Sequence, residues 1–168
     1  MRFVLLPSPL LGPFESYLTM RGIKSFPVRF ERQCRNACQL ASWLAAHPAV
    51  ERVYYTSDPE HPDAATIKRL FPADLYGAMI SFELKGADRE GVFAFMDRLK
   101  MIVRATSLGD VHTMILHPVM ASHRDIAPKQ RERMGIRENL LRLSVGIEAI
   151  EDITADLEQA LGGTGATS

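Results

Sequence analysis

Apolar and polar residues alternate without interruption in the segment NLLRLSVGIE, residues 139–148. Every second residue from Leu141 to Ile147 is apolar, and the residues between them include Arg142. Such alternation predicts a β-strand with one face buried in a core. An arginine in the middle of this strand has two interpretations: it faces solvent on an exposed side of the sheet, or it binds a specific partner.

Four other segments have the pattern or the composition of strands. In GAMISFELKG, residues 77–86, apolar positions again alternate with mixed ones. The other predicted strands are residues 50–55, 101–106 and 112–118, and SLGD at 107–110 is a loop between the last two.

Apolar residues recur at spacings of three and four between the strands, which is typical of helices with one buried face. The predicted helices are residues 13–22, 27–47, 64–71, 88–100 and 149–161. Gly22 is expected to stop the first helix, and Asp88 to cap the fourth. The polar stretch at 121–135 is predicted to be a loop with at least one helical turn. The buried stripe of the second helix is predicted to contain Phe30, Cys34, Ala37, Cys38, Ala41, Leu44 and Ala45.

This order of elements predicts an α/β domain, α+β-like in layout, with about five strands interleaved with helices. One face of each strand is apolar and the other is mixed. We therefore expect helices on one face of the sheet, with the other face left to meet something else. Such a domain is not expected to be complete by itself.

Composition narrows the classes of function. The 168 residues suffice for one domain with a core, and 46% apolar with 24% charged residues is typical of a globular protein. Lys plus Arg and Asp plus Glu number 20 each, so the zero net charge gives no reason to expect nucleic acid or a membrane as a partner. The apolar start is interrupted by three prolines and lacks a small-residue cleavage site. We therefore expect a cytoplasmic protein.

Arg142 and the segment TSLGD at 106–110 are the candidate binding residues. Arg142 has short neighbours on its predicted face, Ser144 and Gly146, which would leave a recess above the strand. A guanidinium offers a rigid fork of donors that matches a carboxylate. The loop can offer hydroxyl and backbone N–H donors to an anion. Most Ser-Leu-Gly sequences, however, are only turns.

Other reactive residues have simpler interpretations. Cys34 and Cys38 lie four apart on a predicted helix and are expected to be small apolar side chains in a reducing compartment. A metal pair is the weaker interpretation because no third or fourth ligand lies nearby. The five histidines form no spacing typical of a metal site, and we predict no metal. The residues alone do not form a complete catalytic set.

Several segments in order resemble the C-terminal portion of the Cys/Met-metabolism family of pyridoxal-phosphate (PLP) enzymes. That family includes cystathionine γ-synthase, cystathionine β- and γ-lyases, methionine γ-lyase and O-acetylhomoserine sulfhydrylase. The resemblance extends from Leu11 to Leu161, so that residues 1–10 are unmatched and 162–168 are expected to form a flexible tail. The segments are GPFESYLTMRGIKSFPVRFERQCRNA, HPAVERVYY, YGAMISFEL, SLGDVHTMILHP, ASHRDIAP and RLSVGIEAIEDITADLEQAL.

The resemblance implies a fold and a binding role. The fold would be the small C-terminal domain of a fold-type I PLP enzyme, with a mostly antiparallel sheet. In the family, the arginine of RLSVGIE grips the α-carboxylate of the amino-acid substrate, and the serine of the SLG loop helps; these roles fall on Arg142 and Ser107. Thr106 joins this substrate-carboxylate site at a position where many members carry glutamate, and Asp110 stands where many carry glycine.

The family's catalytic lysine and cofactor-binding residues lie upstream of the matching portion. None of the five lysines here, Lys24, Lys68, Lys85, Lys100 and Lys129, has the context of the family's lysine motif. We therefore expect PLP to serve the complete enzyme, with no covalent cofactor and no catalytic residue in this chain alone.

Two functions follow as hypotheses. In the first, the chain is a split subunit or truncated form that supplies the carboxylate site of a trans-sulfuration enzyme. Its partners would be an amino-acid substrate and a large PLP-binding domain or full-length relative, in a homo- or hetero-oligomer. In the second, the chain is a non-catalytic interaction module that associates with itself or with a full-length relative.

Overall fold

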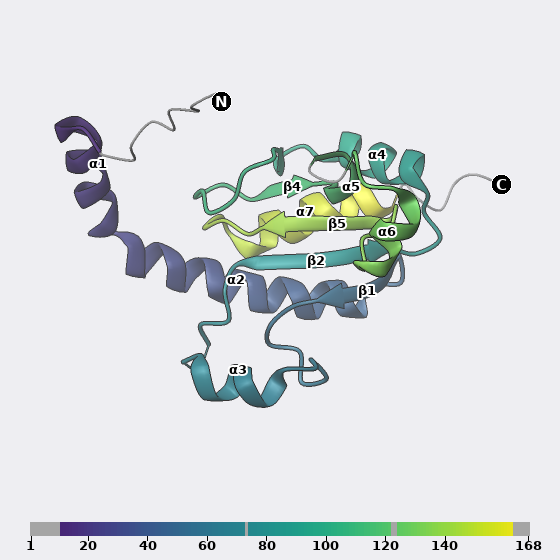
Figure 1. The fold of residues 1–168 in the computed structure, drawn as a ribbon, viewed down its shortest axis with the longest axis horizontal. Helices are drawn as coiled ribbons and strands as arrows, with labels where there is room; N and C mark the ends of the chain where they lie inside the picture. Colours follow the sequence, from purple (N-terminus) through teal and green to yellow (C-terminus); the bar gives the residue numbers. More distant parts are fainter. Residues whose placement is uncertain (1–10, 73, 122–123, 163–168) are drawn as a thin grey trace, which may run out of the picture.

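A five-stranded sheet forms the centre of the computed structural model, which describes residues 11–72, 74–121 and 124–162 (Figure 1). The strand order is β1-β2-β5-β4-β3, and every pairing is antiparallel except that of β3 with β4. Strand β5 is therefore central, between β2 and β4. The strands are β1 (Val50–Tyr54), β2 (Met79–Leu84), β3 (Val103–Arg104), β4 (Met114–Leu116) and β5 (Leu140–Ser144).

Helices surround this sheet unevenly. The long helices α2 and α7 pass behind it, whereas the short helices α5 and α6 lie at one end of it, and α1 projects away from the rest of the fold (Figure 1). The helices are α1 (Pro13–Ile23), α2 (Phe26–Ala46), α3 (Ala64–Leu70), α4 (Arg89–Arg98), α5 (Pro118–Ala121), α6 (Pro128–Arg133) and α7 (Ile150–Leu161).

The core confirms the alternation in β5. Leu141, Leu143 and Val145 are fully buried, and they belong to one cluster with residues of β2, α2, α4 and α7. Phe82 of β2 meets Phe95 of α4 edge to face, with ring centroids 6.3 Å apart. Burial of each such side chain stabilises the fold by about 1.5–3 kcal/mol, so this face fixes which side of β5 Arg142 occupies.

The predicted fold class is confirmed: the protein is α/β, with five mostly antiparallel strands and its long helices on one face of the sheet. The Asp88 cap is also confirmed, because its carboxylate accepts the Gly91 N–H at 2.9 Å. Strand β3 is shorter than predicted, since as an edge strand it pairs only with β4.

One predicted boundary is wrong. Helix α1 continues through Gly22 to Ile23, and Lys24 keeps a right-handed helical conformation (φ −59°, ψ −31°). Gly22 therefore does not stop the helix, because the chain never takes the left-handed turn that makes glycine necessary there. Within the ranges that the structure describes, no helix is both long enough and apolar enough to cross a membrane.

Candidate functional site

Arg142 lies in the middle of β5, on the side of the sheet opposite the fully buried leucines. Its Cα partners are Ser81 on β2 and Leu116 on β4. The side chain is half-buried, and it makes no hydrogen bond or ion pair with any other residue that the structure describes. Its donors are therefore not occupied by described groups of its own chain, and a carboxylate could accept two of them in parallel.

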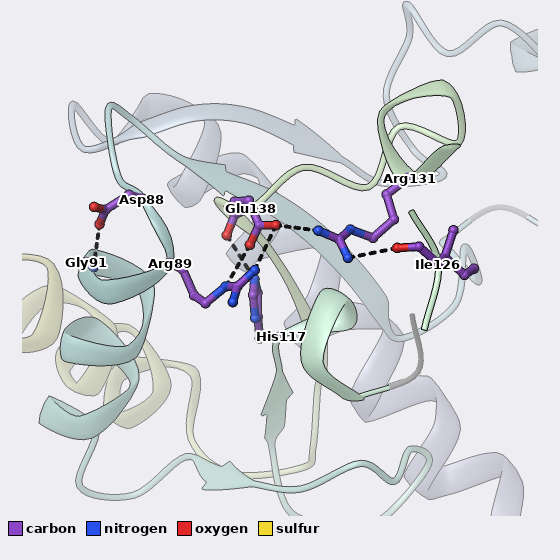
Figure 2. Close-up of polar contacts among 7 residues, drawn as sticks. All are labelled: Asp88, Arg89, Gly91, His117, Ile126, Arg131 and Glu138. Carbon is purple, nitrogen blue, oxygen red and sulfur yellow. Dashed lines mark hydrogen bonds and ion pairs between the residues drawn. The ribbon is translucent and has the colours of Figure 1, made fainter. Parts of the chain in front are cut away.

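The start of β5 is anchored by the carboxylate of Glu138, two residues before the strand (Figure 2). Arg89 donates to both of its oxygens, at 2.9 and 3.1 Å, and Arg131 donates to Oε1 at 2.7 Å. The hydrogen bonds from Arg89 lower the pKa of Glu138, and the charges of Arg89 and Arg131 add to this effect. The backbone carbonyl of Glu138 also contacts Nε2 of His117 at 2.8 Å.

A second carboxylate, on β2, ties the start of β5 to its neighbours. Glu83 is fully buried and accepts hydrogen bonds from the Tyr54 hydroxyl at 2.8 Å and from Arg137 at 3.2 Å. The side-chain amide of Asn139 donates to the Leu84 carbonyl at 2.8 Å. The strand therefore enters the sheet in a fixed register, three residues before Arg142.

The end of β5 holds the loop that connects β3 to β4. The Ser144 hydroxyl is buried and accepts the Gly109 N–H at 2.9 Å. Further along, the Ile147 N–H donates to the Val111 carbonyl at 2.9 Å. Since Ser144 and Arg142 lie on the same face of β5, these contacts bring the loop at 106–111, with Ser107, to the side of the sheet that carries Arg142.

Polar side chains from α2 and from the segments that follow β5 and precede β4 reinforce this contact. Gln33 donates from α2 to the Asp110 carbonyl at 2.7 Å, and Asn36 donates to the carbonyls of Gly146 and Glu148 at 3.1 and 2.9 Å. The Glu148 carboxylate accepts the backbone N–H and the hydroxyl of Thr113, at 2.6 and 2.8 Å. We call these residues the polar clasp: Gln33, Asn36, Thr113, Ser144 and Glu148.

The clasp corrects one expectation from the sequence. The small residues after Arg142 do not leave an open recess, because the backbone of Val111 and Thr113 packs directly against Gly146. The glycine is needed there for a close approach of two backbone segments. The space predicted above the strand is therefore filled, at its Gly146 end, by the loop itself.

Ser107 and Thr106 are both exposed on that loop. Thr106 lines a shallow cavity of about 520 Å³ at the β3–β4 edge, together with Phe93 of α4 and Met120 of α5. Arg142 is not among the residues that line it. Thr106 and Ser107 therefore lie on one loop, which the hydrogen bond between Gly109 and Ser144 joins to the strand of Arg142. Of the three predicted residues, only Thr106 lines this cavity.

The clasp is not evident from the sequence. One signal was available: Gln33 and Asn36 interrupt the apolar stripe of α2 on its buried side, three residues apart. Buried amides of this kind require partners. The partners, however, lie more than seventy positions away along the chain, where a local pattern cannot reveal them.

The family described as Cys/Met metabolism PLP-dependent enzyme matches residues 7–162. The chain belongs to that family. It is 45% identical over 152 residues to L-methionine gamma-lyase of Fusobacterium nucleatum subsp. polymorphum, and 43% identical over 152 residues to cystathionine beta-lyase of Coxiella burnetii, covering 90% of this chain in each case.

Solved structures of this Cys/Met-metabolism family have the same fold. Cystathionine gamma-lyase from Lactobacillus plantarum, complexed with L-serine, matches with a TM-score of 0.84 and 38% identity over 94% of this chain. In that match the chain covers 40% of the solved protein, and it spans 38% of the length of the two relatives above. The chain therefore corresponds to part of the longer enzymes.

Membership of this family implies PLP, which needs a lysine amine for its covalent attachment. All five lysines of the chain are exposed, and none lies in the core. The described residues therefore do not fit a covalent PLP site. Among those same residues, no group of three or more potential ligands is arranged to hold a metal ion.

Proposed function

We propose that the chain is the C-terminal, substrate-carboxylate-binding domain of a PLP-dependent trans-sulfuration enzyme. The reaction of the complete enzyme would be elimination or replacement at the β or γ carbon of a sulfur- or oxygen-substituted amino acid. The family match, the names of the relatives and the share of their length that the chain spans all support this proposal. The lysine and the cofactor would belong to a part of the enzyme that this chain does not match.

One observation carries the proposal: Arg142 occupies the centre of β5 without a polar partner among the described residues, in a strand fixed at both ends. A guanidinium on a rigid strand can hold a carboxylate in one orientation, since two parallel hydrogen bonds define the plane of the acid group. The Ser107 hydroxyl would supply a further donor from the loop.

The role of these residues would be to orient the substrate. An amino acid held by its carboxylate presents its amino group and Cα in a fixed direction, and such positioning lowers the entropy cost of the reaction. The clasp contributes because it holds the loop at 106–111 against β5. Bond breaking would depend on groups supplied by the lysine-bearing part.

A chimeric enzyme tests the proposal. Residues 7–162 would replace the matching portion of the Fusobacterium nucleatum methionine γ-lyase, so that the chain is tested inside a complete protein. We expect the chimera to release a thiol and an α-keto acid from methionine. The same chimera with Leu143→Asp, which disrupts the core beneath Arg142, is the negative control. A chimera that folds and binds PLP but releases neither product would contradict the proposal.

A further inference from the structure

One buried amide on α2 contacts both segments of the candidate site. The Gln33 side chain is 4% exposed, and its Nε2 donates to the Asp110 carbonyl at 2.7 Å and to the Val145 carbonyl at 3.1 Å. Asp110 belongs to the candidate binding loop at 106–111, whereas Val145 directly follows β5. The two hydrogens of this nitrogen therefore bridge that loop and the strand that carries Arg142.

The loop depends on contacts of this kind for its position. Residues 106–108, with Ser107 among them, make no hydrogen bond with any other residue that the structure describes. Each of the next three residues is bound by one group from another segment, at 2.7–2.9 Å: Gly109 by Ser144, Asp110 by Gln33 and Val111 by Ile147. On its C-terminal side, the place of the Ser107 hydroxyl is therefore set by these three anchors.

Gln33 is the anchor that cannot move with the loop. Ser144 and Ile147 belong to β5 and to the segment just after it, whereas Gln33 belongs to a helix of 21 residues. Cys34 and Ala37, its neighbours on that helix, are fully buried. Because a close-packed helix holds its backbone in place, the amide of Gln33 is a fixed point against which the loop is held.

We infer that Gln33 is a positioning residue for the substrate carboxylate. The inference rests on the proposed function. Gln33 is buried and acts through the loop, which it holds so that the Ser107 hydroxyl and the Arg142 guanidinium approach the same acid group. Without its two hydrogen bonds the loop would open locally, and the Ser107 hydroxyl would be within reach of the carboxylate for less of the time.

Hydrogen exchange of the Gly109 amide, measured on the full chain, tests whether Gln33 holds the loop. Gln33→Met removes both donors from a side chain of similar length, and we expect the amide to exchange at least about tenfold faster, the equivalent of one lost hydrogen bond. Tyr55→Phe is the matched control, because it removes a donor to the Gly77 carbonyl at 2.8 Å on the β1 side of the sheet. The control should leave the exchange of Gly109 unchanged. If Gln33→Met does not fold, Gln33→Asn, whose amide is one methylene too short to reach both carbonyls, should have the same effect.

Kinetics of the chimera with the Fusobacterium nucleatum enzyme test whether the loop acts on the carboxylate. We expect Gln33→Met to lower kcat/KM for methionine by about 5- to 10-fold, and to leave the affinity for the corresponding amine without a carboxylate unchanged. In a chimera that already carries Ser107→Ala, Gln33→Met should have no further effect, since the hydroxyl through which it acts is gone. A residue that only stabilises the fold would weaken both chimeras by the same factor.

Two results would overturn the inference. One is unchanged exchange of the Gly109 amide in Gln33→Met. The other is an equal loss of kcat/KM from Gln33→Met with and without the Ser107 hydroxyl. The proposed function fails in a different way: a chimera that releases no thiol contradicts the function, while the exchange rates still decide whether Gln33 holds the loop. An active chimera in which Gln33→Met changes nothing contradicts the inference only.

Discussion

A methyl group added at Gly146 should separate the binding loop from β5. A Cβ atom at this position would lie 2.6 Å from the backbone nitrogen of Thr113, and closer still to the Val111 carbonyl oxygen. Both are backbone atoms, so the collision cannot be relieved by turning a side chain. Ordinary contact distances begin near 3.4 Å, so the loop must move by the better part of an ångström.

The cost of Gly146→Ala follows from these contacts. Overpacking of this kind costs about 1–3 kcal/mol. Movement of the loop also weakens two hydrogen bonds, from the Gly146 N–H to the Thr113 hydroxyl and from the Ile147 N–H to the Val111 carbonyl, at about 1 kcal/mol each. We expect a total loss of about 3–5 kcal/mol, which corresponds to a melting temperature lower by about 6–20 °C for a chain of this size.

Thermal unfolding followed by circular dichroism measures this effect. Gly22→Ala is the matched control, because a Cβ atom there meets nothing within 4 Å and the residue is already helical. We expect this control to keep the wild-type melting temperature or to raise it slightly. If Gly146→Ala melts within about 2 °C of the wild type, the packing argument for the clasp is wrong.

Three further predictions concern stability. Asp156→Asn should lower the free energy of unfolding by about 2–4 kcal/mol in urea titrations, because the carboxylate accepts three backbone N–H groups at 2.9 Å, whereas exposed Asp152→Asn should change it little. Leu143→Ala should cost about 2–5 kcal/mol, against almost nothing for exposed Leu108→Ala. Burial lowers the pKa of His117, so the stability that its neutral form provides is present above pH ~6.5 and declines as the pH falls below that value. His117→Gln should flatten the dependence of the melting temperature on pH between 7 and 5.

The fold was accessible from the sequence where local chemistry decides the structure. The alternation around Arg142 predicted β5 because a strand with one buried face admits only that periodicity. The Asp88 cap was predictable because an N-cap needs only its own first turn. The length of β3 was not, since it depends on which strand becomes its neighbour.

The candidate site also contains residues that the sequence predicts and residues that it does not. Arg142, Ser107 and Thr106 were proposed from their segments, and their binding roles stay predictions. The clasp could not be found from the sequence, because Gln33 and Asn36 on α2 meet residues more than seventy positions away. The exposure of α1 was also hidden, since its apolar spacing resembles that of a helix in a core.

The most direct test of the central claim measures the binding of an amino acid with and without its carboxylate. In the chimera, the affinities for methionine and for the corresponding amine that lacks the carboxylate would be measured for the wild type, Arg142→Ala and the exposed-site control Arg133→Ala. We predict that Arg142→Ala weakens methionine binding by about 10- to 100-fold, the equivalent of a charge-assisted hydrogen bond. Its affinity for the amine should be unchanged, and Arg133→Ala should match the wild type for both compounds. Equal losses for the two compounds, or no loss for methionine, would show that Arg142 does not hold the carboxylate.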